Sequence, residues 1–77
     1  NKMSEEKIKS IIESITKKNL TQDENLLDDG VLDSLMTLAL IEELEESFAV
    51  LIPTNEFTHF NFNSIDSISE MLKRIGF

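Results

Sequence analysis

Three stretches of the chain repeat apolar residues at the spacing of an α-helix, whereas no two segments can be paired as β-strands. Residues 4–18 carry isoleucines along one face, residues 34–48 lack Gly and Pro and have a broad apolar face, and residues 64–75 form a third stripe. The apolar run at residues 49–52 has no partner strand, so we predict a packed loop there. This pattern favours an all-α fold.

Capping residues predict where these helices begin and end. Ser4 can cap the first helix, and Lys17 and Lys18 would fall in its last turn. Asn63 or Ser64 can cap the last helix, and Lys73, Arg74 and Gly76 suit its end. Helical spacing gives the expected buried stripes, which contain Ile8, Ile11, Ile12 and Ile15, then Leu35, Leu38, Leu40, Ile41, Leu44 and Phe48, and finally Ile65, Ile68, Leu72 and Ile75.

The length of 77 residues, with no Cys, fits one small domain that depends on apolar packing. Asn1 and Lys2 precede Met3, a plausible native start, and could be vector-derived, so we expect a single domain over residues 3–77. Residues 55–60 could add a short helix that presents Phe57 and Phe60 to the core. The prediction is a small four-helix bundle with three main helices and one short helix.

Residues 19–33 interrupt the helical pattern with a long polar segment that also contains Leu20, Leu26, Leu27, Val31 and Leu32. A loop of this length is uncommon in a compact domain unless it is functional or packed down by its own side chains. These apolar residues predict that the loop packs against the core of the domain. Gly30 is the natural position for a positive φ angle.

The charge balance argues against several classes of partner. Fifteen acidic residues against seven basic ones give a net charge of −8, which would repel nucleic acid and anionic membrane surfaces. The acidic surface either steers the protein towards basic partners or only keeps it in solution, and charge alone favours the second reading. No segment is long and apolar enough for a signal peptide or membrane span, so we expect a cytoplasmic location.

The sequence gives little support for a catalytic site or a metal site. His59 is the single histidine, there is no Cys, and no Gly-rich phosphate loop is present, so neither an enzyme nor a metal site is expected. A calcium loop aligned on Gly30 would place Met36 where a bidentate Glu is required. We therefore expect His59 to have no chemical role.

The segment Gly30-Val31-Leu32-Asp33-Ser34-Leu35 begins the Leu- and Glu-rich second helix, which is followed by Ile52-Pro53. With the helix order and the long first loop, this pattern resembles the phosphopantetheine-binding carrier proteins, which include acyl, peptidyl and D-alanyl carriers. The resemblance extends from about Ser4 to Ile75. It implies a four-helix bundle of the acyl carrier protein type.

The resemblance also implies a role for the Asp-Ser-Leu motif. Ser34 would receive 4'-phosphopantetheine from coenzyme A through a phosphopantetheinyl transferase, Asp33 would belong to the transferase recognition motif, and Leu35 would anchor the motif in the core or contact partner enzymes. The position is physically sensible, because a helix N-terminus offers unpaired backbone donors and a positive dipole end to a phosphate. Asp33 can also cap this helix.

The tripeptide Asp66-Ser67-Ile68 repeats the local chemistry of the motif and serves as an internal comparison. Ser67 lies between apolar residues of the last predicted helix, with no long loop and no helix start before it, so we interpret it as structural. The context around the dipeptide, and not the dipeptide itself, selects Ser34.

The Gly-x-Leu-Asp-Ser form and the stretch Ile52-Pro53-Thr54-Asn55-Glu56-Phe57 look most like stand-alone D-alanyl and peptidyl carriers. The resemblance then implies a monomer, loaded by an adenylating enzyme, that delivers an aminoacyl or acyl thioester to a downstream acceptor enzyme, for example in nonribosomal peptide synthesis or D-alanylation. A fatty acid or polyketide carrier, and an unmodified helical interaction domain, are the alternatives.

Partner enzymes could recognise three further residues of the second helix. Met36 either contacts a partner or fills a gap beside Leu40, and Glu42 and Glu43 form either a docking surface or only the solvated face of the helix.

Overall fold

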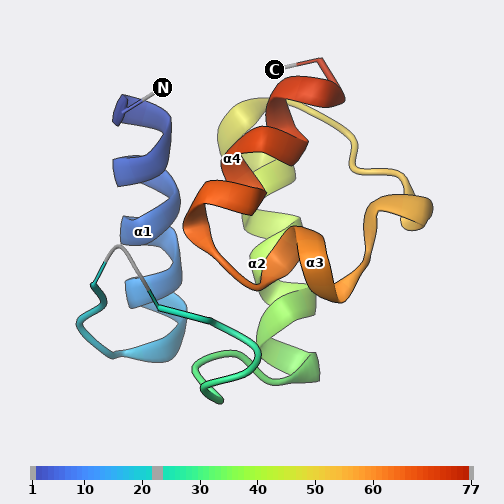
Figure 1. Ribbon diagram of the computed structural model, residues 1–77. Helices are drawn as coiled ribbons and strands as arrows, with labels where there is room; N and C mark the ends of the chain where they lie inside the picture. Colours follow the sequence, from blue (N-terminus) through green and yellow to red (C-terminus); the bar gives the residue numbers. More distant parts are fainter. Residues whose placement is uncertain (1, 22–23, 77) are drawn as a thin grey trace.

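The computed structural model describes residues 2–21 and 24–76, and within these ranges it contains helices and no strand (Figure 1). The helices are α1 (Lys2–Thr16), α2 (Ser34–Phe48), α3 (His59–Phe62) and α4 (Ile65–Arg74), with a 3₁₀ turn at Thr54–Glu56. The all-α prediction of three main helices and one short helix is confirmed.

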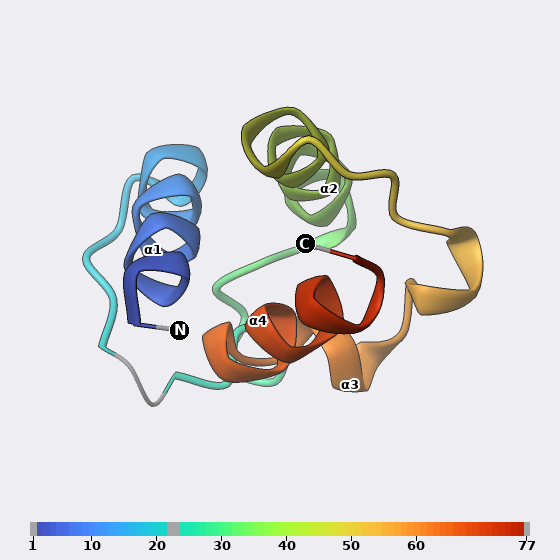
Figure 2. The same cartoon turned by 90° about the horizontal axis from the view of Figure 1, so that it is seen from above.

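The three long helices surround one core. α1 packs against both α2 and α4, while α3 lies against α4 on the side away from α1 (Figure 2). α1 begins and α4 ends at one end of the molecule, and α2 begins at the other (Figure 1). The start of α2 therefore lies at the end where the long loop enters the bundle.

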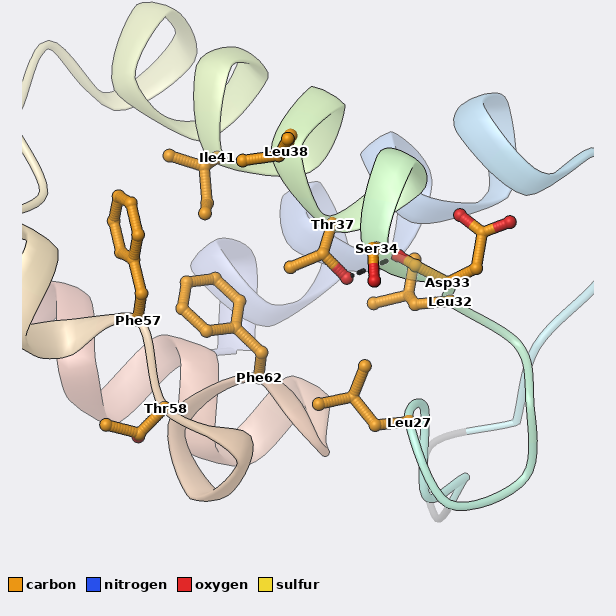
Figure 3. A pocket seen from close by; sticks show the side chains of 10 residues that line it. All are labelled: Leu27, Leu32, Asp33, Ser34, Thr37, Leu38, Ile41, Phe57, Thr58 and Phe62. Atoms are coloured by element: carbon orange, nitrogen blue, oxygen red, sulfur yellow. Dashed lines mark hydrogen bonds between the residues drawn. The ribbon is translucent and has the colours of Figure 1, made fainter.

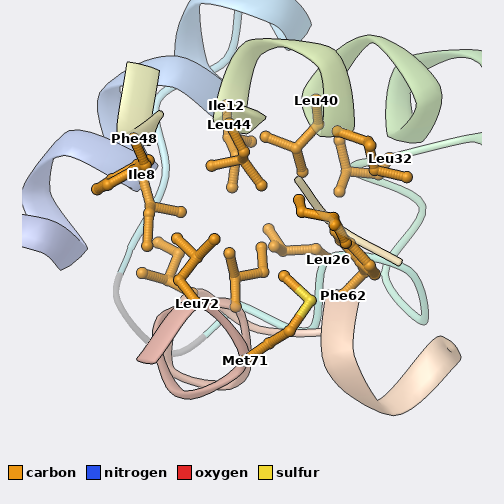
Figure 4. Close-up of a cluster of buried hydrophobic side chains, with 14 of the residues drawn as sticks. Ile8, Ile12, Leu26, Leu32, Leu40, Leu44, Phe48, Phe62, Met71 and Leu72 are labelled. Carbon is orange, nitrogen blue, oxygen red and sulfur yellow. The ribbon is translucent and has the colours of Figure 1, made fainter. Parts of the chain in front are cut away.

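Buried apolar side chains from every α-helix and from the long loop fill the centre (Figure 4). The predicted helical stripes supply most of them, and the loop residues Leu20, Leu26, Val31 and Leu32 are buried as predicted. The core consists of Ile8, Ile12, Leu20, Leu26, Val31, Leu32, Leu40, Ile41, Leu44, Phe48, Ile52, Phe62, Ile65, Ile68, Met71 and Leu72.

Four predicted core residues are exposed instead. Leu35 and Leu38 are 78% and 55% exposed, because they lie on the side of α2 that carries Glu42 and turns away from the buried face of Leu40, Ile41, Leu44 and Phe48. Phe57 and Phe60 are 40% and 74% exposed, since the chain forms a 3₁₀ turn and then the short α3 in place of one helix over 55–60. Phe62 takes the buried position that Phe60 was expected to fill.

The bounds of the first helix also differ from the prediction. α1 already includes Lys2, so Ser4 is an interior, buried residue and not the cap. The helix ends at Thr16 because Lys17 turns into the left-handed region with φ 61°. Lys17 and Lys18 consequently follow the helix. The bounds of α2 agree with the predicted run, and Ser64 caps α4 as expected.

α1 and α2 end in the same way. After each helix one non-glycine residue, Lys17 or Ala49, adopts a positive φ, and its N–H donates to the carbonyl of Glu13 or Glu45, four residues earlier. The carboxylates of these same glutamates accept the N–H of Leu20 and Ile52 at 2.8 and 2.9 Å. Both of these apolar residues are buried, so each glutamate directs the following loop back to the core.

Replacing Ala49 by Gly should stabilise the fold. Ala49 has φ 55°, where a Cβ atom is unfavourable, so we expect Ala49→Gly to raise the free energy of unfolding by about 1 kcal/mol. The matched control Ala39→Gly, in the helical interior of α2, should lower it by about 1 kcal/mol. Urea unfolding of both variants measures the difference, and a loss of stability in both would contradict the expectation.

Candidate functional site

Ser34 is the first residue of α2, and Asp33 caps this helix start. Asp33 has an extended backbone, and its Oδ1 accepts the N–H of Met36 at 2.8 Å, which confirms the predicted cap. The Asp33 carbonyl accepts both the N–H of Thr37 at 2.9 Å and its Oγ1–H at 2.8 Å. The backbone on both sides of Ser34 is therefore held in place.

The Ser34 side chain is exposed, and its hydroxyl lies on the side of α2 that faces Thr37, Leu32 and Phe62 (Figure 3). The first-turn N–H groups of a helix have no intrahelical acceptors, and the helix dipole places partial positive charge there. An anionic group esterified to this hydroxyl would lie in a favourable field.

A groove of about 460 Å³ opens beside Ser34. One wall is formed by α2, the other by the segment from Phe57 to α3, and Leu27 of the long loop closes one end (Figure 3). The groove depends on α3 standing away from α2, which no local sequence pattern specifies. The lining is mostly apolar and consists of Leu27, Leu32, Asp33, Ser34, Thr37, Leu38, Ile41, Phe57, Thr58 and Phe62.

The loop that leads into Ser34 is an ordered turn over residues 24–32. Gly30 has φ 75°, as predicted, and the N–H of Leu32 donates to the carbonyl of Leu26 at 2.9 Å. The N–H of Leu26 donates in turn to the carbonyl of Asn63 at 2.7 Å. The loop is thus fixed to the junction between α3 and α4.

Asp28 connects this loop to α3. Its Oδ1 lies 2.8 Å from Nε2 of His59, the first residue of α3, and its Oδ2 accepts from Nδ2 of Asn63 at 3.1 Å. Hydrogen bonds from His59 and Asn63 hold the pKa of Asp28 below its ordinary value of 3.8. His59 therefore has an electrostatic contact that the sequence did not reveal.

Replacing Asp28 by Asn should make the free energy of unfolding depend less steeply on pH in the acid range. The pKa of Asp28 is lowered on folding, so its carboxylate stabilises the folded state above pH 3.8, and this stabilisation is lost as pH falls through the lower folded-state pKa. Urea unfolding at a series of acid pH values checks this. Glu42→Gln, which alters an exposed carboxylate on α2, is the control, and identical profiles for Asp28→Asn and wild type would contradict the prediction.

The other predicted site residues lie along one helix. Leu35 is exposed and so does not anchor the motif in the core, whereas Met36 is partly buried and packs against the core. Glu42 and Glu43 are exposed on α2, about two turns after Ser34. The structure brings Asp33, Ser34 and Leu35 together at the helix start and leaves the two glutamates further along α2.

Ser67 differs from Ser34 in its environment, but the prediction that no helix start precedes Ser67 is wrong. Ser64 caps α4 directly before Ile65, so Ser67 lies in the first turn and not deep inside the helix. Its N–H donates to Ser64 Oγ at 3.0 Å, and its Oγ accepts from the same hydroxyl at 3.0 Å. Ser67 is partly buried and takes part in the cap, in contrast to the exposed Ser34.

Charge is distributed unevenly around the site. All seven basic residues fall within residues 2–18 and 73–74, so residues 19–72 contain acidic groups and no Lys or Arg. The charged side chains of the described loop residues before Ser34 and those of α2 are therefore all acidic. The described part of the chain contains no cluster of His, Cys, Asp and Glu that could hold a metal ion. None of its helices has the length and apolar character needed to cross a bilayer.

Comparison with known protein families gives a match over residues 6–72 to the family described as "Phosphopantetheine attachment site". The chain is 44% identical over 54 residues to the D-alanyl carrier protein of Streptococcus uberis, covering 70% of this chain and 68% of that protein. It is 40% identical over 65 residues to the D-alanyl carrier protein of Streptococcus suis, covering 82% of both.

Two solved structures have similar folds. Both are complexes of a glycine:[carrier protein] ligase from Bradyrhizobium japonicum. In the complex with glycylated carrier protein, the match has a TM-score of 0.79 at 26% identity and covers 90% of this chain and 97% of that chain. In the complex with the cognate carrier protein and an analogue of glycyl adenylate, it has a TM-score of 0.82 at 25% identity and covers 94% and 97%.

Proposed function

The chain belongs to the family of proteins with a phosphopantetheine attachment site, and we propose that the hydroxyl of Ser34 is the atom to which the group is attached. Members of this family carry 4'-phosphopantetheine covalently and act as substrates of other enzymes, without catalysis of their own. The protein is such a carrier. The alternative of an unmodified helical interaction domain does not agree with this membership.

We assign Ser34 as the attachment site because its hydroxyl is exposed and lies at a capped helix start. The chain's other serines lack this combination: Ser4 and Ser69 are buried, Ser10, Ser14 and Ser47 lie well past the first turns of α1 and α2, and the hydroxyls of Ser64 and Ser67 are engaged in the cap of α4. A transferase can reach the Ser34 hydroxyl without unfolding α2. The residues present therefore fit a phosphodiester at this position.

Attachment is a transfer reaction in which Ser34 is the nucleophile. A phosphopantetheinyl transferase removes the hydroxyl proton, the Ser34 oxygen forms a bond to the phosphorus that bears the pantetheine, and the pyrophosphate bond of coenzyme A breaks. Adenosine 3',5'-bisphosphate leaves. When bound, the prosthetic group supplies a terminal thiol that holds cargo as a thioester.

Within the chain, Asp33 and the groove have separate tasks in this proposal. Asp33 holds the first turn of α2 so that its free N–H groups point towards the phosphate. The apolar groove beside Ser34 gives the attached arm a surface that is shielded from water on two sides. The domain contributes attachment, orientation and partner recognition.

Substitution of Ser34 tests the attachment site directly. We expect wild-type protein incubated with coenzyme A and a broad-specificity phosphopantetheinyl transferase to gain the mass of one phosphopantetheinyl group. Ser34→Ala should gain nothing, because no other exposed serine lies at a helix start, whereas the control Ser67→Ala should be modified like wild type. Intact-mass spectrometry gives the answer. An equal gain on Ser34→Ala would place the attachment elsewhere.

The proposed cargo is an amino acid. The chain is at least 40% identical to D-alanyl carriers over much of its length, and both similar structures are complexes of a carrier with a ligase for glycine. An adenylating enzyme would activate the amino acid with ATP and transfer it to the thiol, and a downstream acceptor enzyme would remove it. Since coenzyme A and ATP are cytoplasmic, we place loading in the cytoplasm.

Partner recognition is proposed to involve Leu35 and the surrounding acidic surface. Leu35 is 78% exposed beside Ser34, and a large exposed leucine next to a modification site suits a transient interface. Asp33, Met36, Glu42 and Glu43 extend this surface along α2. Because the charged side chains of α2 are all acidic, the complementary surface on the partner should be basic.

Replacing Leu35 by Ala should weaken loading but not folding. Because Leu35 is exposed, stability should change by no more than about 0.5 kcal/mol, while kcat/KM for aminoacylation by a D-alanine-adenylating ligase should fall about tenfold. The matched control is Leu51→Ala, which truncates a leucine that is 84% exposed beyond the other end of α2.

Two outcomes would contradict this pair of proposals. Equal kcat/KM values for Leu35→Ala and Leu51→Ala would remove Leu35 from the interface. Loading of the modified wild type with long-chain fatty acids, and with no amino acid, would replace the aminoacyl carrier by a fatty acid carrier.

A further inference from the structure

Asn63, the C-cap residue that follows α3, makes several hydrogen bonds with the loop before Ser34. Its Oδ1 accepts the N–H groups of Leu27 and Asp28 at 2.9 and 3.0 Å. Its Nδ2 donates to Asp28 Oδ2 at 3.1 Å, and its backbone carbonyl accepts the N–H of Leu26 at 2.7 Å. One residue thus binds three consecutive loop residues.

These contacts are the main polar link between the loop and the rest of the fold. Within residues 24–32, every hydrogen bond to a part of the described chain that is distant in sequence ends on Asn63 or His59. The remaining hydrogen bonds of this segment are local, such as the N–H of Asp29 to the carbonyl of Asn25 at 2.7 Å. Without Asn63, the loop would depend on apolar contacts and the exposed Asp28–His59 pair.

The anchored loop residues form part of the site. Leu27 lines the groove beside Ser34, and its N–H is held by Asn63. Asn63 follows Phe62, which lines the opposite part of the same groove. Asn63 therefore joins the loop residue that closes one end of the groove to the wall that α3 provides opposite α2.

We infer that Asn63 is a positioning residue for the modification site: it holds the loop that leads into Ser34 against α3, so that a transferase meets a preformed surface. This inference rests on the proposed attachment of phosphopantetheine at Ser34. Asn63 does not touch the reacting oxygen. It acts through the N–H groups of Leu26, Leu27 and Asp28.

A charge-exchange pair tests this role. Asn63→Asp keeps an acceptor for the two loop N–H groups but sets a carboxylate against that of Asp28, which displaces the loop. Asp28→Asn combined with Asn63→Asp reverses the donor and acceptor and restores the contact. Asn63→Ala removes all side-chain contacts, and Asp66→Asn, an exposed carboxylate of α4, is the control.

The readouts are the KM and kcat for coenzyme A-dependent modification by the transferase, together with amide hydrogen exchange. We expect KM for the carrier to rise about fivefold to tenfold in Asn63→Ala and Asn63→Asp, and to return to within about twofold of wild type in the double variant. kcat should change little. Exchange at the Leu27 and Asp28 amides should accelerate, while exchange at Ile12 and Leu44 should not.

A purely structural role for Asn63 would lower the amount of folded carrier, which circular dichroism measures, and leave KM per folded molecule unchanged; that result would overturn the inference. A raised KM without recovery in the double variant would overturn it as well. If wild type accepts no phosphopantetheine, the proposed function fails. Unchanged exchange at Leu27 in Asn63→Ala would then reject the anchoring role separately.

Discussion

Burial of aliphatic side chains between α1, α2 and α4 is the interaction on which the rest of this structure depends. The chain has no disulfide, so apolar packing must offset the entropy of ordering it. The segments that are not stable alone use this core. The four-residue α3 is too short to persist by itself and is held by Phe62, and the loop before Ser34 is held by Leu26 and Leu32. The proposed modification site at Ser34 is thus a surface feature supported by a common core.

Polar side chains decide how the connecting segments run over that core. Glu13 and Glu45 direct the chain after α1 and α2, and Asn63 fixes the loop before Ser34. Glu56 plays a comparable part in the segment before α3. Its Oε1 accepts a hydrogen bond from Arg74 at 2.7 Å and one from the side-chain amide of the buried Asn61 at 2.9 Å. These bonds keep the segment with Phe57 in place, and so they maintain the wall of the groove opposite α2.

The parts of the fold that were predictable share a local cause. Helical periodicity predicted α2 and the buried face of α4, and Asp33, Ser64 and Gly30 were recognised because their roles depend on residues within one turn. The predictions that were wrong required knowledge of distant segments. Leu35 and Phe60 have the apolar character of core residues, but no helix covers them in the assembled bundle. Asn63 was recognised only as a possible cap, because its partners lie about 35 residues away.

The sequence by itself determined the helical class and the start of α2, which follow from periodicity and capping chemistry. It also led to the proposal of Ser34, and not Ser67, as the attachment site, through a motif in its context. The tertiary structure decided what surrounds that serine. The groove exists because α3 packs on α4 and stands away from α2, and Leu35 is exposed because no other element covers the side of α2 that also carries Glu42. Such features depend on the relative placement of elements. Apolar packing between distant segments sets that placement, together with hydrogen bonds such as those of Asn63, and local pattern does not encode these contacts.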